Sequence, residues 1–172
     1  MAGRILRTLA GLGVVLTFAA SSAHALSCVP SGITDSYLHA AASDAEFNVL
    51  KGRLTFNQRK LDRRLETIVR SNSGGTVEIT AQLQGAALGA VGFTIRANVQ
   101  ATLHLTCLGP WCPRATTDRD VILFAEKVDG GLRVRLDACS GDLHALTPES
   151  EQDVLTCHQG GVCIPRAEQV FR

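Results

Sequence analysis

Alternating apolar and polar residues mark several stretches of this chain as β-strands. Over Thr76–Leu83 and Ile95–Cys107 every second residue is apolar or small, the pattern of a strand with one buried face. Leu132–Ala138 alternates in the same way. Val121–Ala125 is almost wholly apolar, which is typical of a strand covered on both faces. With Glu46–Phe56, the chain has five predicted strands.

The first predicted strand changes its buried face along its length. Leu50 and Leu54 fall on one face, whereas Phe47 and Val49 fall on the other. Such a change needs a bulge or a sharp bend, and Gly52 supplies the backbone freedom for one. A bent strand of this kind can serve both halves of a closed barrel.

The segments between the strands carry turn and helix signals. Gly85–Gly92 is rich in glycine and alanine and is expected to be a flexible connection, with Ile95 the first inward residue of the strand that follows. Asp129-Gly130-Gly131 is a hairpin signal. Asn57–Arg70 is highly charged and only weakly helical by its pattern. Cys107–Pro113 is expected to be a loop.

Two helices are predicted, one at each end of the strand region. The early one covers Thr34–Ala42. The late one has Thr147 as its cap and Pro148 at its first position, and Gly160 stops it.

These elements predict a mainly β fold. Closing five strands on themselves removes exposed strand edges. The expected architecture is therefore a five-stranded OB-type barrel with a short N-terminal helix and a C-terminal helix. A β-sandwich is the alternative, because strand signals alone do not separate the two.

The beginning of the chain has the three parts of a secretory signal peptide. Arg4 and Arg7 give a positive start, Leu9–Ala20 is an uncharged apolar run, and Ala23-His24-Ala25 is a cleavage site with small residues. The apolar run is too short to span a bilayer core of roughly 30 Å, so no transmembrane anchor is expected in the mature chain. We therefore predict a signal peptide over residues 1–25 and export to the periplasm or the medium.

Cleavage leaves residues 26–172, for which we expect a single disulfide-stapled domain. Removing Arg4 and Arg7 leaves 15 basic residues against 16 acidic ones, a net charge of −1. This balance argues against nucleic-acid binding, which needs a concentrated basic face. The basic cluster Arg59-Lys60 with Arg63-Arg64 is expected to be solvated.

All six cysteines lie after residue 25, and in an exported chain they predict three disulfides. The alternatives are metal binding and acylation of Cys28 as in a lipoprotein. The spacings of Cys107 with Cys112 and of Cys157 with Cys163 are not those of a zinc site. Acylation of Cys28 would leave an odd thiol.

The sequence contains no convincing catalytic constellation, and we expect neither a metal nor a cofactor. Trp111-Cys112-Pro113 resembles part of a redox site, but the second cysteine is missing because residue 115 is alanine. Weak thiol-disulfide exchange through Cys107 and Cys112 remains an alternative. The mature chain has four histidines, none paired at the one-turn spacing of a helical metal site: His39, His104, His144 and His158.

The outward face of the third predicted strand is the candidate binding surface. Its polar residues are Arg96, Asn98, Gln100 and His104. The strand's other face is apolar, so these side chains are expected in solvent, where they can meet a partner.

Short motifs in the chain resemble netrin-like modules, which include the tissue inhibitors of metalloproteinases. They are Ser27-Cys28, Ser43-Asp44-Ala45 leading into Phe47–Phe56, and Cys139 after the fifth strand. The segments Ala81–Gly85 and Cys107–Cys112 are also similar to a group of exported bacterial proteins with that pattern.

The resemblance implies an OB barrel whose N-terminal segment is tied to it by a disulfide. The strand pattern gives a second argument for this tie. Cys139 follows the inward Ala138 and so falls on the outer face of the barrel, where it can reach an N-terminal segment that contains Cys28. We therefore expect three pairs: Cys28–Cys139, Cys107–Cys112 and Cys157–Cys163.

The function we predict is an exported, non-catalytic binding module for an envelope or extracellular protein. The resemblance implies metalloprotease inhibition as an alternative. In those inhibitors the first mature residue is a cysteine that approaches the enzyme's zinc, whereas here that position is Leu26 and Cys28 matches the second cysteine of the pattern. We therefore do not expect inhibition by that route.

Overall fold

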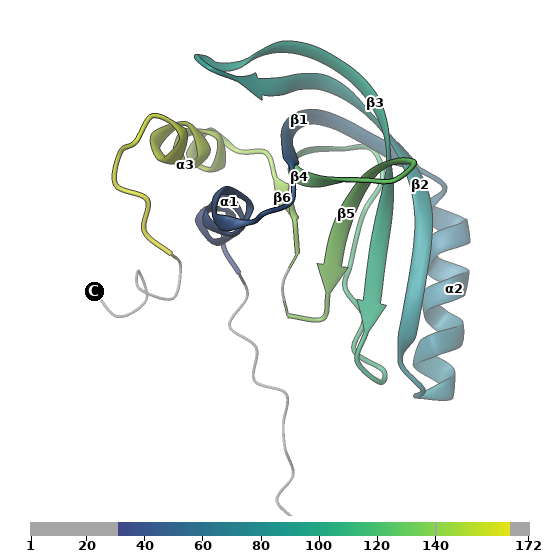
Figure 1. Cartoon of the computed structure of the whole chain (residues 1–172). Helices are drawn as coiled ribbons and strands as arrows, with labels where there is room; N and C mark the ends of the chain where they lie inside the picture. Colours follow the sequence, from purple (N-terminus) through teal and green to yellow (C-terminus); the bar gives the residue numbers. More distant parts are fainter. Residues whose placement is uncertain (1–30, 140, 166–172) are drawn as a thin grey trace, which may run out of the picture.

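The computed structural model describes residues 31–139 and 141–165, and within them the chain is mainly β (Figure 1). The predicted signal peptide lies outside the described residues. In chain order the elements are α1 (Ile33–Ala42), β1 (Phe47–Phe56), α2 (Gln58–Ser71), β2 (Gly75–Gly89), β3 (Gly92–Cys107), β4 (Arg119–Val128), β5 (Gly131–Asp137), β6 (Leu143–Ala145) and α3 (Pro148–His158).

Five of these strands form a closed ring of hydrogen-bonded neighbours. β1 pairs with β2, β2 with β3, β3 with β5, β5 with β4, and β4 again with β1. The β3–β5 pairing is parallel and the others are antiparallel. The short β6 adds to β4. The described strands therefore belong to one hydrogen-bonded sheet.

The interior of the ring holds the apolar positions that the alternation predicted. In β2 and β3 the buried side chains occupy every second position, and they include Val77, Ile79, Leu83, Leu103 and Leu105. Val134 and Leu136 of β5, which pair with Leu103 and Leu105 of β3, belong to the same core. The periodicity of these three strands is confirmed.

β4 is buried on both faces, as its apolar sequence predicted. Leu123 points into the ring, whereas Ile122 and Phe124 point out of it into a second apolar cluster. That cluster also contains Ile33 of α1 and Val154 of α3. The two terminal helices are thus held against the outside of β4, and they contact each other.

The region around Gly85–Gly92 is the clearest correction to the sequence-based prediction. It is not a flexible connection, because β2 continues to Gly89 and β3 begins at Gly92. Residues 86–95, here called the arm, extend beyond the ring and arch toward α3 (Figure 1). Backbone pairing between the two strands overrides the weak β propensity of glycine and alanine.

The arm also changes which side chains are buried. The β2–β3 register shifts between Ala87 and Leu88, so that Ala87 pairs with Ile95 but Leu88 pairs with Phe93. Beyond this bulge, Leu88 and Phe93 pack on the outer cluster with α1 and α3. Ile95, expected to point inward, is 55% exposed because the ring no longer lies beneath it.

The charged segment after β1 forms a full helix rather than a weakly helical stretch. The Asn57 side chain accepts a hydrogen bond from the Lys60 backbone N–H and caps α2. Leu61 is fully buried against the core of the ring, and the helix ends at Asn72 in the left-handed conformation. The early and late helices form where expected, and Thr147 caps α3 as predicted.

Disulfides join Cys107 to Cys112 and Cys157 to Cys163, as predicted. Cys139 is also disulfide-bonded, and its predicted partner Cys28 lies outside the described residues.

Among the helices of residues 31–139 and 141–165, none is long and apolar enough to cross a membrane.

Candidate functional site

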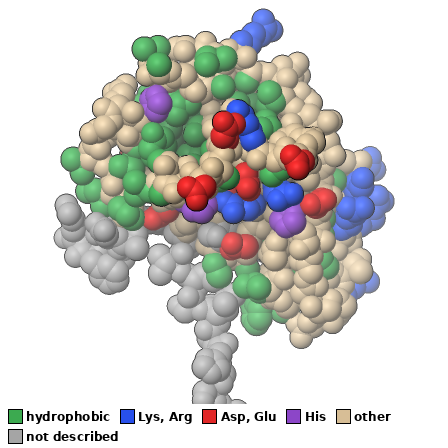
Figure 2. Space-filling view, viewed as in Figure 1, with side chains coloured by type: hydrophobic (Ala, Val, Ile, Leu, Met, Phe, Trp, Pro, Cys, Tyr) green, Lys and Arg blue, Asp and Glu red, His purple; other side chains and the backbone are tan. Residues whose placement is uncertain are grey.

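An apolar pocket of about 250 Å³ opens between α1, the start of β1 and the arm. We call it the α1 pocket. Figure 2 shows apolar side chains gathered in a hollow beneath the arm, beside the two terminal helices. The residues that line the pocket are Tyr37, Ala40, Ala41, Phe47, Asn48, Val49, Ala87, Leu88 and His158.

The local sequence explains why this pocket exists. Phe47 and Val49 occupy the face of β1 that points away from the ring, which is the face change anticipated around Gly52. Leu88 joins them because the bulge in the arm turns it toward the helices. Ala40 and Ala41 have small side chains, so α1 leaves space where larger residues would fill it.

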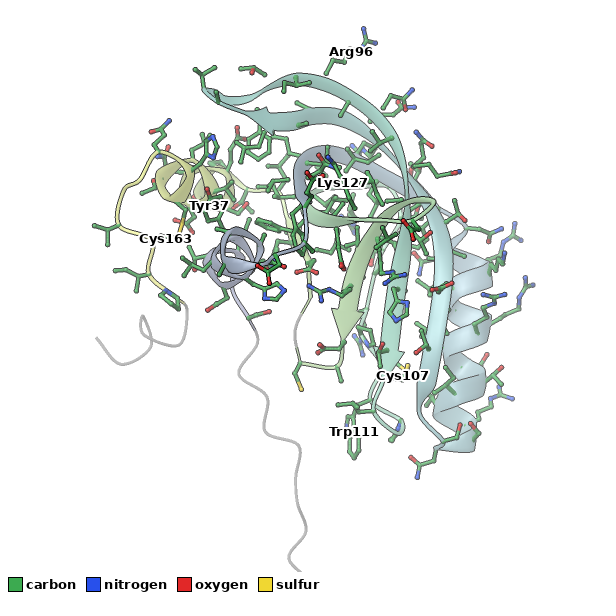
Figure 3. The ribbon with its side chains drawn as sticks, viewed as in Figure 1. Tyr37, Arg96, Cys107, Trp111, Lys127 and Cys163 are labelled. Carbon is green, nitrogen blue, oxygen red and sulfur yellow. A yellow bond between two sulfur atoms is a disulfide. The ribbon has the colours of Figure 1, made fainter. Side chains whose placement is uncertain are left out.

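The polar groups at the pocket wall are largely satisfied by one another. His158 Nε2 lies 3.0 Å from the Gly89 carbonyl oxygen, and its Nδ1 lies 3.3 Å from the Tyr37 hydroxyl. In the neutral ring, Nε2 donates to the carbonyl and Nδ1 accepts from the hydroxyl. Burial raises the pKa of Tyr37. These bonds fasten the arm to α1 and α3, and Figure 3 shows Tyr37 between the two helices.

Asn48 differs from the other polar residues that line the α1 pocket. It lines the pocket, yet its amide makes no hydrogen bond with any of the described residues. A carboxamide both donates and accepts, which is what a peptide group requires of its partner. The pocket therefore combines an apolar wall with one polar group that suits a peptide.

A polar cluster lies on the other side of α1, in a cavity of about 310 Å³. Arg135 Nη2 donates to His39 Nε2 at 2.7 Å, and Arg135 Nε lies 3.4 Å from Asp142 Oδ2. Burial raises the pKa of Asp142, although the nearby Arg135 guanidinium acts in the opposite direction. The Arg135 guanidinium also stacks over Phe47, so this cluster borders the α1 pocket.

Ser36 and His144 form the one arrangement here that resembles a catalytic pair. Ser36 Oγ lies 2.8 Å from His144 Nε2, but it also donates to the Gly141 carbonyl at 3.2 Å. Which of the two groups donates depends on the tautomer of His144, because a serine hydroxyl can either donate or accept. Burial lowers the pKa of His144 to about 4. Ser36 is only 5% exposed, and its two contacts link α1 to His144 of β6 and to Gly141 before that strand.

The structure does not gather the candidate surface predicted on β3 into a site. Arg96 and His104 are eight residues apart on one strand, about 26 Å at 3.3 Å per residue. Asn98 accepts from Gln82, and His104 pairs with Glu78 on the neighbouring strand. Gln100 is exposed. The four side chains form a solvated strip along the outer face, with Arg96 projecting at its far end (Figure 3).

Part of the pocket signal was present in the sequence. The face change from Phe47 and Val49 to Leu50 is visible in the sequence, although there it indicates a bend that serves both halves of a barrel. The contribution of Leu88 depended on the bulge, and that of His158 on how α3 packs, and neither follows from local patterns. Within the described ranges, no group of three potential metal ligands is present.

No protein-family model, no curated protein and no solved structure matches the chain.

Proposed function

We propose that the mature chain is an exported, non-catalytic interaction module that binds an apolar side chain of a partner protein in the α1 pocket. The pocket itself carries this proposal. It is concave, lined mostly by apolar side chains, and has one polar group without an internal partner. Such a combination is the usual signature of a binding site.

The size of the pocket favours a side chain over a free small molecule. Its volume of about 250 Å³ is below the roughly 300–1,000 Å³ of sites that enclose drug-sized ligands. The arm beside it also carries exposed apolar residues, with Val91 78% and Ile95 55% exposed. A small pocket with an apolar rim is suited to a partner protein that inserts one side chain into the pocket and buries the exposed apolar residues around it.

The proposed scaffold is an OB-type, netrin-like barrel. A small barrel needs five strands that close on themselves, and the β1–β4 pairing supplies the closure. The disulfide at Cys139 supports the expected tie to the N-terminal segment. Three disulfides are typical of a domain that folds in an oxidising compartment, which supports export.

Two features support a non-catalytic role. Ser36 of the Ser36–His144 pair is only 5% exposed, whereas a nucleophile must be reached by its substrate. The Cys107–Cys112 disulfide has a sequence separation of five, not the Cys-X-X-Cys spacing of redox-active pairs, and Cys107 within it is 3% exposed.

The proposal is tested by titrating the isotope-labelled mature protein with N-acetylphenylalaninamide and N-acetylleucinamide in NMR experiments. We expect saturable chemical-shift changes at Ala40, Ala41, Val49 and Leu88, with dissociation constants of about 1–10 mM. N-acetylserinamide should produce no such changes. Absence of saturable shifts at these residues with both apolar compounds would contradict the proposal.

Two matched variants show whether a loss of the chemical-shift changes comes from filling the α1 pocket or from a general disturbance of α1. Ala41 lines the pocket, whereas the adjacent Ala42 does not, and both are exposed. Ala41→Phe should abolish the shifts, because the added ring occupies the pocket. Ala42→Phe should leave them unchanged. Equal effects of the two substitutions would show that the apolar compounds bind elsewhere.

A further inference from the structure

The loop that follows β3 forms a rigid turn with apolar side chains at its corners. The Leu108 N–H donates to the Trp111 carbonyl at 2.9 Å, and the Trp111 N–H donates to the Leu108 carbonyl at 3.1 Å. Gly109 has φ +58°, which glycine adopts readily, and Pro110 follows it. The Cys107–Cys112 disulfide closes the loop directly behind the turn.

This turn holds its two largest side chains in solvent. Trp111 is 57% exposed and Leu108 is 46% exposed. Figure 3 shows Trp111 projecting from the end of the molecule, away from the ring. Since the turn is fixed by hydrogen bonds and a disulfide, little backbone freedom is lost when these side chains are covered. An exposed tryptophan on a rigid support is suited to binding.

The end of α2 lies against this turn. A Cβ added to Gly109 would lie 3.4 Å from Asn72 Oδ1, and one added to Gly74 would lie 3.1 Å from the Gly109 nitrogen. We call the combined surface of residues 69–75 and 108–114 the tryptophan tip. Val69 adds a third large apolar side chain to it, 43% exposed.

The charges of the tryptophan tip have one sign. Its two segments contain no aspartate or glutamate and two arginines, Arg70 and Arg114. Arg70 pairs with Glu66 one turn earlier in α2, whereas Arg114 makes no ion pair with a described residue. The remaining polar residues, Ser71, Asn72 and Ser73, are uncharged. Within these two segments the apolar side chains are thus bordered by polar and cationic residues, while the acidic Asp137 of β5 lies opposite Thr106, just before the turn.

Helix α2 extends this positive character along one side of the molecule. It has five basic residues against Asp62 and Glu66, a net charge of +3: Arg59, Lys60, Arg63, Arg64 and Arg70. All five are exposed. Figure 2 shows basic side chains along the edge of the molecule where α2 lies. A membrane with anionic headgroups attracts such a surface.

We propose that the tryptophan tip docks on an anionic lipid membrane. Trp111 and Leu108 enter the boundary between headgroups and acyl chains, where tryptophan is favoured. Arg70 and Arg114 face the headgroups, whereas Arg59 at the other end of α2 lies about 16 Å further along the helix. A convex tip enters a fluid lipid surface directly, whereas a protein partner would need a cavity shaped to the turn. The tip therefore fits a membrane better than a protein.

The chain contains one tryptophan, so its fluorescence reports on the tip alone. The mature protein, with its disulfides intact, is mixed with vesicles of phosphatidylcholine and phosphatidylglycerol at 3:1, or of phosphatidylcholine alone. We expect Trp111 emission to shift to shorter wavelength on the anionic vesicles and to be quenched by brominated acyl chains. Partitioning should be about tenfold stronger than on neutral vesicles and should weaken in high salt.

Vesicle sedimentation with matched variants completes the test. Trp111→Ala should lower partitioning about tenfold, whereas Val91→Ala, at the most exposed apolar residue of the arm, should not change it. The near-UV spectrum in the tyrosine region and the unfolding midpoint show whether each variant is folded. Unchanged emission on anionic vesicles, or sedimentation of Trp111→Ala equal to that of the wild type, would overturn the proposal. An emission shift produced by an envelope protein fraction but not by lipid would assign the tip to a protein partner instead.

Discussion

Gly52 of β1 and Gly85 of β2 lie directly opposite each other, at a separation that leaves no room for a side chain on either. A Cβ on Gly85 would lie 2.0 Å from the Lys51 carbonyl oxygen, and one on Gly52 would lie 2.2 Å from that of Gln84. This close approach occurs where β1 pairs with β2 and β4 at once. The β1–β2 pairing is therefore tightest at two glycines, beside the β1–β4 pairing that closes the ring.

Gly85→Ala should destabilise the fold by about 3 kcal/mol, because the new methyl group meets backbone that cannot move aside. Urea unfolding of the mature protein measures this change. Gly130→Ala is the control. Its Cβ meets nothing within 4 Å, so only its φ of +88° opposes the substitution, at about 1 kcal/mol. Equal losses for the two variants would contradict the close contact.

Most of the ring could be predicted from the sequence, because its strands alternate with a period of two and its turns carry glycine. The arm could not. Gly85–Gly92 resembles a loop in composition, and only its pairing with β3 makes it a strand. The three residues of β6 are too few to show a period, and they pair only because the chain returns beside β4.

The candidate site was less predictable than the fold. The strip containing Arg96 and His104 is polar and faces outward, and these two properties are shared by binding surfaces and ordinary solvated strand faces. The α1 pocket forms from segments far apart in the chain, from Tyr37 to His158. Its geometry depends on helix packing that local patterns do not encode.

Acid should weaken the fold through His144. Burial lowers the pKa of this histidine from 6.5 to about 4, so the unfolded chain binds the proton more readily than the folded one. The stabilisation from the neutral ring is therefore present above pH 6.5 and is lost as the pH falls toward 4. We expect a loss of up to about 3 kcal/mol in the free energy of unfolding.

His144→Gln provides the control for this pH dependence, since glutamine can still form a hydrogen bond with Ser36 but does not titrate. The variant should show a flatter dependence of unfolding free energy on pH between 6.5 and 4. Asp142 has the opposite effect on stability. Burial raises its pKa above 3.8, so the folded chain binds this proton more readily than the unfolded chain, and acidification just above pH 3.8 stabilises the fold. A slope that is identical in the wild type and the variant would exclude His144 as its source.

The disulfide framework is checked by peptide mapping without reduction. We expect one cross-linked peptide that joins Cys28 to Cys139, beside the two short pairs. Together they would consume all six cysteines of the chain. Recovery of Cys28 joined to any other cysteine would contradict the proposed tie between the N-terminal segment and the barrel.

The mature protein should not inhibit zinc endopeptidases at stoichiometric concentrations. If cleavage follows Ala25, the free amino group belongs to Leu26, two residues from the nearest cysteine. Ordering such a terminus on a metal costs conformational entropy. Mass analysis establishes the terminus, and titration against a panel of zinc endopeptidases measures inhibition. Nanomolar inhibition that disappears on acetylation of Leu26 would contradict this expectation.

The most direct test of the proposed function locates a bound apolar side chain in the α1 pocket. Intermolecular nuclear Overhauser effects are measured between the ring protons of N-acetylphenylalaninamide and the methyl groups of the mature protein. We expect contacts to the methyl groups of Ala41, Val49 and Leu88, and none to those of Val99 on β3. Contacts confined to Val91, Leu108 or other exposed apolar residues, or no contacts at saturating concentration, would contradict the proposal that this pocket is the binding site.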